Sequence, residues 1–238
     1  AVVPQGLATI VDENRVVGHE KDGEDTYPIY ESKTYLRMYG FDGAKLSDVE
    51  VTPALFGLAD TEEEGYFGVD KIITDGKDLY MSLHSDNVEA TGKLFCLDTD
   101  GSLKGTISLA DGGSYYFQSL YFFGENRLFA FYYDQNGGGT SAFILNTETG
   151  EKTKIAQDSF PGGYAVFYSS FGGPDGMYLF DSTVGVYKLD PDAMAQELVC
   201  NFLNSDFIFS SGEMAYTDMP VVALGENRFA ALRNSTKG

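Results

Sequence analysis

Few residues in this chain combine the types and the spacing that catalysis or metal binding requires. His19 and His84 are the only histidines, and a metal site built on them would need a carboxylate or thiolate ligand at the right geometry as well. The pair His19-Glu20 also lacks the second histidine of a zinc-protease motif. We therefore predict that both histidines lie near strand ends and that no residue is a metal ligand. The acidic residues 62–64 and the acids of residues 20–32 could hold a hard cation loosely, but charged runs of this kind usually form solvated faces.

One acidic segment, Asp98-Thr99-Asp100-Gly101-Ser102, resembles part of a calcium-binding loop. If Gly101 held the sixth position of an EF-hand, the first and twelfth positions would be Cys96 and Ile107. Neither side chain is a calcium ligand, so the EF-hand pattern fails. The segment is instead predicted to be a hairpin turn.

Catalysis of glycoside hydrolysis would need two opposed carboxylates roughly 5 to 10 Å apart. Asp70 and Asp218 lie near predicted inner strands and are the one pair that we nominate for this role, without expecting them to fill it. The sequence has no nucleophile elbow, phosphate-binding loop or dinucleotide fingerprint. We predict that the chain is not an enzyme, has no catalytic residue and needs no cofactor.

Charge and hydropathy exclude two further classes of function. The chain has 36 acidic and 16 basic residues among 238, a net charge of −20, with no basic cluster. Nucleic-acid binding depends on cations that neutralise phosphates, so we predict no nucleic-acid partner. No apolar run approaches the roughly 18 residues of a membrane span, so no transmembrane segment is expected.

A repeated pattern in the sequence predicts the strands and turns that would position any functional site. The opening Gly124-Glu125-Asn126-Arg127, a turn followed by an apolar strand, has relatives elsewhere in the chain. These relatives are Asp12-Glu13-Asn14-Arg15, Asp75-Gly76-Lys77-Asp78, Asp175-Gly176 and Gly225-Glu226-Asn227-Arg228. Beyond a longer first interval they recur about every 50 residues, a period typical of propellers and solenoids.

Four short strands fill each period, and aromatic residues and glycines suit strands and turns. We predict an all-β propeller of four-stranded antiparallel blades, with about five repeats, the last of them incomplete. The repeats cover approximately residues 1–51, 69–109, 115–157, 163–202 and 218–238, as a single propeller domain or part of one. In the first repeat a turn at residues 12–15 separates two strands and residues 20–32 form an inserted loop. Residues 52–56 could start a short helix, and residues 165–169 are expected to be the first strand of the fourth repeat.

The candidate binding residues come from the predicted inner strands and their aromatic side chains. The long connections between strands share one end of the blades, and loops on a rigid scaffold often carry function. At that channel mouth, sugar rings could stack on aromatic residues and bond to amide groups. The predicted ligand-binding residues are Tyr115, Tyr116, Gln118, Tyr121, Phe167 and Tyr168. The alternative is that these aromatic residues only pack one blade on the next.

Three passages carry a resemblance to a known family: the turn Leu97-Asp98-Thr99-Asp100-Gly101 with its relative at residues 40–43, residues 198–206, and residues 223–229. They resemble the propeller region of secreted lipoproteins from Gram-positive bacteria, a region that often precedes the solute-binding domain of a sugar ABC transporter. The family often has Trp where this chain has Phe202, and its motif is structural, so it transfers no functional residue. The resemblance implies an extracellular, surface-anchored location and a non-catalytic role.

These observations lead to a non-catalytic extracellular propeller module for ligand recognition or scaffolding. The expected ligand is a carbohydrate or another small molecule, and a C-terminal domain beyond Gly238 is a further expected partner. One alternative is a glycan-active propeller enzyme that uses channel carboxylates. Another is a module that serves only for protein–protein docking.

Overall fold

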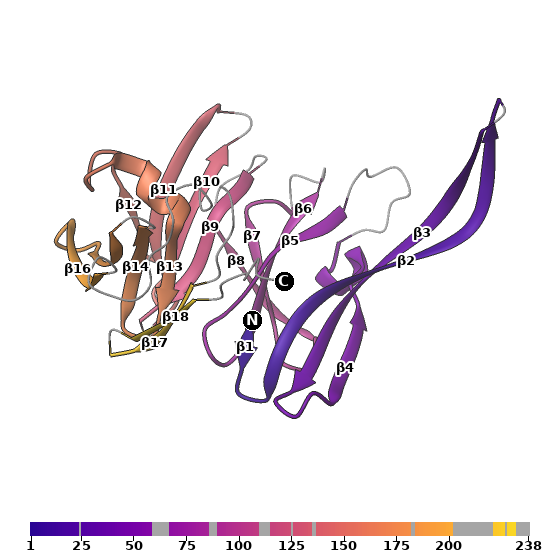
Figure 1. Ribbon diagram of the computed structural model, residues 1–238, viewed down its shortest axis with the longest axis horizontal. Helices are drawn as coiled ribbons and strands as arrows, with labels where there is room; N and C mark the ends of the chain where they lie inside the picture. The colour runs from indigo at the N-terminus through magenta and orange to yellow at the C-terminus, as the bar shows by residue number, and fades with distance from the viewer. Residues whose placement is uncertain are drawn as a thin grey trace, which may run out of the picture. The chain divides into compact units, whose positions relative to one another are not determined.

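The computed structural model forms two compact units, Ala1–Tyr115 and Tyr116–Gly238 (Figure 1). Both units are built from antiparallel sheets whose strands follow one another in chain order. The structure describes residues 1–23, 25–58, 67–85, 90–109, 115–124, 126–134, 137–181, 184–201, 221–226 and 228–231.

The first unit contains two four-stranded sheets. The first sheet consists of β1 (Val2–Val3), β2 (Gly6–Asp22), β3 (Asp25–Gly40) and β4 (Lys45–Glu50), and the second of β5 (Phe67–Thr74), β6 (Leu79–Ser85), β7 (Lys93–Leu97) and β8 (Leu103–Ser108). The 3₁₀ helix η1 (Pro53–Phe56) follows β4. It confirms the predicted short helix, with Pro53 at a position where the missing N–H costs nothing.

The second unit contains two more four-stranded sheets and a strand pair. The sheets are β9 (Tyr115–Phe123), β10 (Arg127–Asp134), β11 (Gly139–Asn146) and β12 (Lys152–Ile155), then β13 (Ser170–Gly173), β14 (Gly176–Asp181), β15 (Gly185–Asp190) and β16 (Ala195–Asn201). The pair is β17 (Val221–Gly225) with β18 (Arg228–Ala231). The 3₁₀ helix η2 (Gly163–Ser169) lies between the two sheets in sequence. The predicted all-β fold of four-stranded antiparallel blades is confirmed.

Each unit has its own apolar core between its sheets. In the first unit Leu36 and Met38 of β3 share a buried cluster with Phe56 of η1 and with Met81 and Phe95 of the second sheet. In the second unit the cluster is mainly aromatic, and it joins β10 to η2, β14 and β15. Alternate residues of inner strands, such as Leu36 and Met38 of β3 or Phe129 and Phe131 of β10, supply much of these clusters, as the period of a strand requires.

Acidic turn residues hold the hairpins in shape. Asp75 Oδ1 accepts hydrogen bonds from the N–H groups of Lys77 and Asp78 (2.8 and 2.9 Å), and Asp75 Oδ2 accepts one from the Tyr80 hydroxyl (2.9 Å). In the second unit the Tyr178 hydroxyl donates to Asp175 in the same way (2.7 Å). Part of the acidic composition is therefore needed by the turns themselves.

The turn predicted at residues 12–15 is wrong. β2 passes through these residues as one strand, and residues 20–32, predicted as an inserted loop, form the end of the β2–β3 hairpin. The Ser32 hydroxyl donates to Asn14 Oδ1 (2.5 Å) and the Thr34 hydroxyl donates to Asp12 Oδ1 (2.7 Å). These cross-strand bonds let turn-forming residue types stay extended.

The strand predicted at residues 165–169 is also wrong, because these residues belong to η2. Gly162 and Gly163 have positive φ angles, of 91° and 62°, which bend the chain into the helix. In a 3₁₀ helix side chains three apart lie on one side, and here Tyr164 and Phe167 are both buried. The first strand of this sheet is instead β13.

Phe131 provides a test of the core of the second unit. Its side chain is 0% exposed, and its ring lies 5.5, 5.7 and 5.1 Å from the rings of Tyr164, Phe167 and Tyr168. We expect Phe131→Ala to lower the free energy of unfolding by roughly 3 to 5 kcal/mol, measured by urea denaturation. Tyr133→Ala on the same strand, where the side chain is 39% exposed, should cost less than about 1 kcal/mol. Equal losses would contradict this packing.

Candidate functional site

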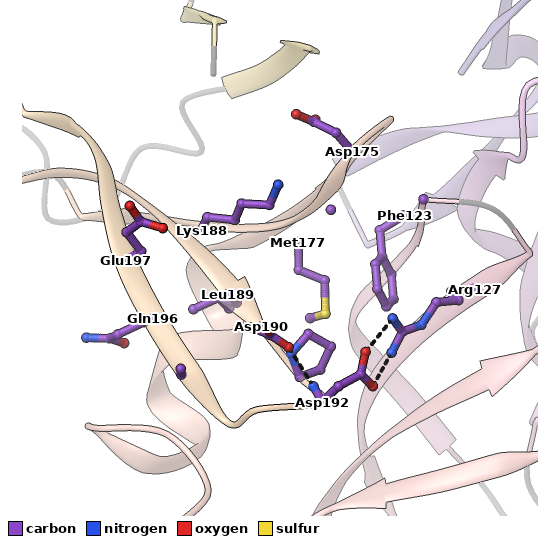
Figure 2. A pocket seen from close by; sticks show the side chains of 14 residues that line it. Phe123, Arg127, Asp175, Met177, Lys188, Leu189, Asp190, Asp192, Gln196 and Glu197 are labelled. Atoms are coloured by element: carbon purple, nitrogen blue, oxygen red, sulfur yellow. Dashed lines mark hydrogen bonds and ion pairs between the residues drawn. The ribbon is translucent and has the colours of Figure 1, made fainter. Parts of the chain in front are cut away.

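A pocket of about 500 Å³ lies in the second unit, at the ends of strands from its two four-stranded sheets (Figure 2). It is lined by the turn between β9 and β10, the turn between β13 and β14, and the strands β15 and β16 with the turn that joins them. These are the tight turns of the repeat. The pocket is therefore at the opposite end of the blades from the long connections.

The β15–β16 turn is organised by Asp190. Its Oδ1 accepts hydrogen bonds from the N–H groups of Asp192 (2.9 Å) and Ala193 (3.0 Å). Met194 then closes the turn with a φ of 50°, in the left-handed region. The two N–H groups hold the pKa of Asp190 below its ordinary value, and Arg127 and Lys188 lower it further. The Asp190 carboxylate is thus an ionised acceptor at the pocket.

Arg127 links the two sheets that border the pocket. Its guanidinium makes a two-pronged ion pair with Asp192, with N–O distances of 3.0 and 2.9 Å, and lies 4.8 Å from the centre of the Phe123 ring. Figure 2 shows this pair and the Phe123 ring beside it. Because both ends of the guanidinium fork are engaged, Arg127 positions the turn and has little capacity left for a ligand.

Lys188 is the other cation at the pocket. Its Nζ lies 6.0 Å from the centre of the Tyr178 ring, and its Cε lies 3.0 Å from the point where a Cβ on Gly176 would be. Within the described residues, no carboxylate oxygen comes within ion-pair distance of this ammonium. Because Gly176 has no side chain, the Lys188 side chain can pass close to it. The N–H donors of the Lys188 ammonium remain open to a ligand.

Carboxylates line the same pocket as this ammonium. Glu197 is the cross-strand partner of Lys188, and Figure 2 shows Lys188 extending toward the side of the pocket where Asp175 lies. In all, two cations and four carboxylates line the pocket: Arg127 and Lys188, with Asp175, Asp190, Asp192 and Glu197. Hydroxyl groups both donate and accept hydrogen bonds. A neutral ligand with several hydroxyls can satisfy both signs of charge, whereas an anion would meet the excess of carboxylates.

The six predicted ligand-binding residues do not line this pocket. Tyr115, Tyr116, Gln118 and Tyr121 are on β9, and Phe167 and Tyr168 are on η2. Tyr116 and Tyr168 are exposed, by 41% and 60%, whereas Tyr115 and Gln118 are half-buried. The exposed tyrosines remain predicted ligand contacts of their own.

Two members of this set take part in packing. The Phe167 side chain is 1% exposed, and its ring lies 4.9 Å from the Phe129 ring. The Tyr121 ring also lies 5.0 Å from the Phe129 ring, and burial raises the pKa of the Tyr121 phenol. Phe167 is therefore a core residue in this structure, and its side chain is not open to a ligand.

The other candidate residues from the sequence are two aspartates and the two histidines. Asp70 is nearly buried on β5 beside the Ser82 hydroxyl (3.4 Å), and Asp218 lies outside the described residues. His19 is on β2 and His84 on β6. In the part of the chain that the structure describes, no group of three metal-ligating side chains comes together.

The predicted hairpin turn at residues 98–102 is confirmed. Asp98 Oδ1 accepts a hydrogen bond from the N–H of Asp100 (2.7 Å), and Asp100 Oδ1 accepts bonds from both the N–H and the hydroxyl of Ser102 (2.9 and 2.7 Å). The carboxylates that resembled calcium ligands thus serve the turn between β7 and β8.

The electrostatics of Asp190 can be tested by titration. We expect its carboxyl group to titrate below the ordinary pKa of 3.8 in carbon-detected NMR spectra, with Asp190→Asn to assign the signal. Since the folded pKa is depressed, the stabilising effect of this carboxylate is present above the unfolded pKa and is lost as the pH falls through the folded pKa. Titration at or above 3.8 would contradict the hydrogen bonds from Asp192 and Ala193.

Comparison of the chain with known proteins does not indicate its family or its function. No protein-family model matches the chain, and no curated protein is significantly similar to it. Within the described residues, none of the helices has the length and apolar character that crossing a membrane requires.

Proposed function

We propose that this chain is a non-catalytic recognition module that binds a carbohydrate-type ligand in the pocket between β10, β14, β15 and β16. The observation that carries the proposal is the Lys188 ammonium. It has no ion-pair partner among the described residues, and it lies in a pocket whose other cation is engaged by Asp192. A donor without an ion-pair partner and carboxylates such as Glu197 line the same pocket, and vicinal hydroxyl groups can bond to both kinds of group.

The size and lining of the pocket support a small polar ligand. Small-molecule sites generally measure about 300 to 1,000 Å³, and this pocket has about 500 Å³. Met177 and Leu189 supply apolar surface at its floor, where the second unit's core begins. The charged rim above them would bond to the ligand's hydroxyl groups, and the floor would take the apolar face of a sugar ring.

The state of Asp190 favours binding over glycan cleavage. A glycosidase needs one carboxylic acid whose pKa is raised so that it can protonate the leaving group. The pKa of Asp190 is instead lowered by two backbone N–H groups. An ionised acceptor can bind a hydroxyl group, but it is a poor proton donor at neutral pH.

We place the module outside the cell, anchored at the surface as part of a lipoprotein or transport-associated protein. The support is the resemblance carried by the Leu97–Gly101 turn and by residues 198–206 and 223–229. An antibody against the chain should therefore label intact cells of the native organism as strongly as permeabilised ones. Labelling that requires permeabilisation would contradict this location.

A ligand screen tests the recognition role. The probes are neutral oligosaccharides of glucose and of N-acetylglucosamine, with oligomers of a uronic acid as the anionic comparison. A neutral ligand at about ten times its Kd should stabilise the fold by roughly 1.4 kcal/mol, which raises Tm by a few degrees. The anionic oligomers should bind at least several-fold more weakly, because carboxylates outnumber cations at the rim.

Variants then locate the binding site. Lys188→Met keeps most of the side-chain stem and removes the donor, so we expect it to abolish the shift that a neutral oligosaccharide produces. Lys154→Met is the matched control, since Lys154 is an exposed lysine on β12 away from the pocket lining. A shift that survives Lys188→Met and disappears in Tyr116→Ala or Tyr168→Ala would move the site to the predicted aromatic residues. Release of reducing sugar ends during incubation would favour the glycan-active enzyme.

A further inference from the structure

The β2–β3 hairpin continues well beyond the sheet that it belongs to. β1 pairs only with residues at the start of β2, and β4 pairs with β3 only from Tyr35 to Tyr39. In the part of the chain that the structure describes, the strand pairs of residues 12–34, which we call the arm, are therefore with each other, and at the base the Thr34 carbonyl also accepts a hydrogen bond from the Val51 N–H (2.8 Å). Figure 1 shows the arm projecting from the first unit. At about 3.3 Å per residue the arm is roughly 35 Å long.

The arm is a defined ribbon with a fixed base. Its register continues from Asp12 opposite Thr34 to Asp22 opposite Asp25, with one irregularity between Val16 and Gly18. At the base, Glu13 forms an ion pair with Arg37, and Lys33 forms one with Glu50 of β4 (3.0 Å). These two ion pairs connect the base of the arm to side chains of the first sheet.

Large apolar side chains are exposed in the middle of the arm. Five of them have exposed fractions between 44% and 58%: Val16, Val17, Tyr27, Ile29 and Tyr30. Water-exposed apolar clusters of this kind commonly mark interaction sites. An isolated two-stranded ribbon is at best marginally stable in water, so these side chains would gain from a partner that covers them.

The apolar side chains lie on both faces of the ribbon. Val16 and Tyr30 are directly opposite each other, which puts them on one face. Ile29 directly precedes Tyr30, and successive side chains of a strand point to opposite faces, so Ile29 belongs to the other face. There its Cδ1 lies 3.7 Å from the point where a Cβ on Gly18 would be. A partner must therefore enclose the ribbon from both sides, as a cleft does.

The charge of the arm indicates the chemistry of that cleft. Residues 12–34 contain seven acidic and three basic side chains, and the end of the ribbon carries Glu20, Asp22 and Asp25. A second copy of the chain, with a net charge of −20, would oppose this acidity. Pro28 has no N–H, so strand addition along the outer edge of β3 is also disfavoured.

We propose that the arm is a docking element for a partner protein that has an apolar cleft bordered by lysine and arginine residues. The side chains of Val16, Ile29 and Tyr30 enter the cleft, and the acidic end of the ribbon contacts its basic border. This interaction surface is separate from the pocket and does not depend on the ligand proposed for it.

The experiment uses the whole chain as bait for the proteins of its native organism, in separate extracts of the cells and of the growth medium, so that the result does not depend on the proposed location. Each captured protein is identified and purified, and its Kd is measured against four baits. The baits are the unchanged chain, the triple variant Val16→Ser/Ile29→Ser/Tyr30→Ser, the double variant Glu20→Lys/Asp22→Lys, and Phe41→Ser. Phe41 is the matched control because it is 69% exposed in the turn between β3 and β4 of the same sheet.

The proposal expects one partner whose Kd rises at least tenfold for the triple and the double variant and stays within about twofold for Phe41→Ser. Its affinity should also fall as salt rises from about 50 to 300 mM, because salt screens the charged border. Unchanged Tm values would show that the variants fold. The proposal is overturned if captured proteins bind all four baits alike, if none is captured, or if light scattering shows an arm-dependent dimer of this chain.

Discussion

The packing of Phe167 against Phe129 and Phe131 is the contact on which the second unit depends. It fixes η2 on β10, and the same buried cluster includes Met177 of β14 and Leu189 of β15. Once these sheets are held together, the tight turns at the ends of their strands lie next to one another. The pocket exists because this aromatic core brings separate turns into one place, and the Arg127–Asp192 pair then joins them at its edge.

Local patterns in the sequence predicted most strands of the fold, since apolar alternation and turn residues act over short distances. They failed at Asp12-Glu13-Asn14-Arg15, where Ser32 and Thr34 across the ribbon satisfy the polar side chains. They failed again at residues 165–169, where Gly162 and Gly163 begin a helix. In both cases a short polar or apolar run fits two backbone conformations, and a distant residue or a glycine pair decides between them.

The pocket could not be predicted because its residues come from turns that are far apart in the sequence. The signals available in the sequence were Gly176, which follows Asp175, and Lys188, whose immediate neighbours Tyr187 and Leu189 are uncharged. The aromatic pattern predicts a different set of ligand contacts, and Phe167, which is 1% exposed, shows the weakness of that pattern. A buried ring and a sugar-stacking ring have the same sequence signature, and only packing separates them.

The two proposed roles are separate, with a small polar ligand proposed for the pocket and a protein surface for the arm. The claim most open to direct measurement is that a neutral oligosaccharide binds at Lys188. Backbone amide NMR during titration with such an oligosaccharide should show shifts concentrated at Gly124, Gly176 and residues 188–197. Shifts confined to β9 and η2, around Tyr116 and Tyr168, would contradict this account and locate the ligand on the exposed tyrosines.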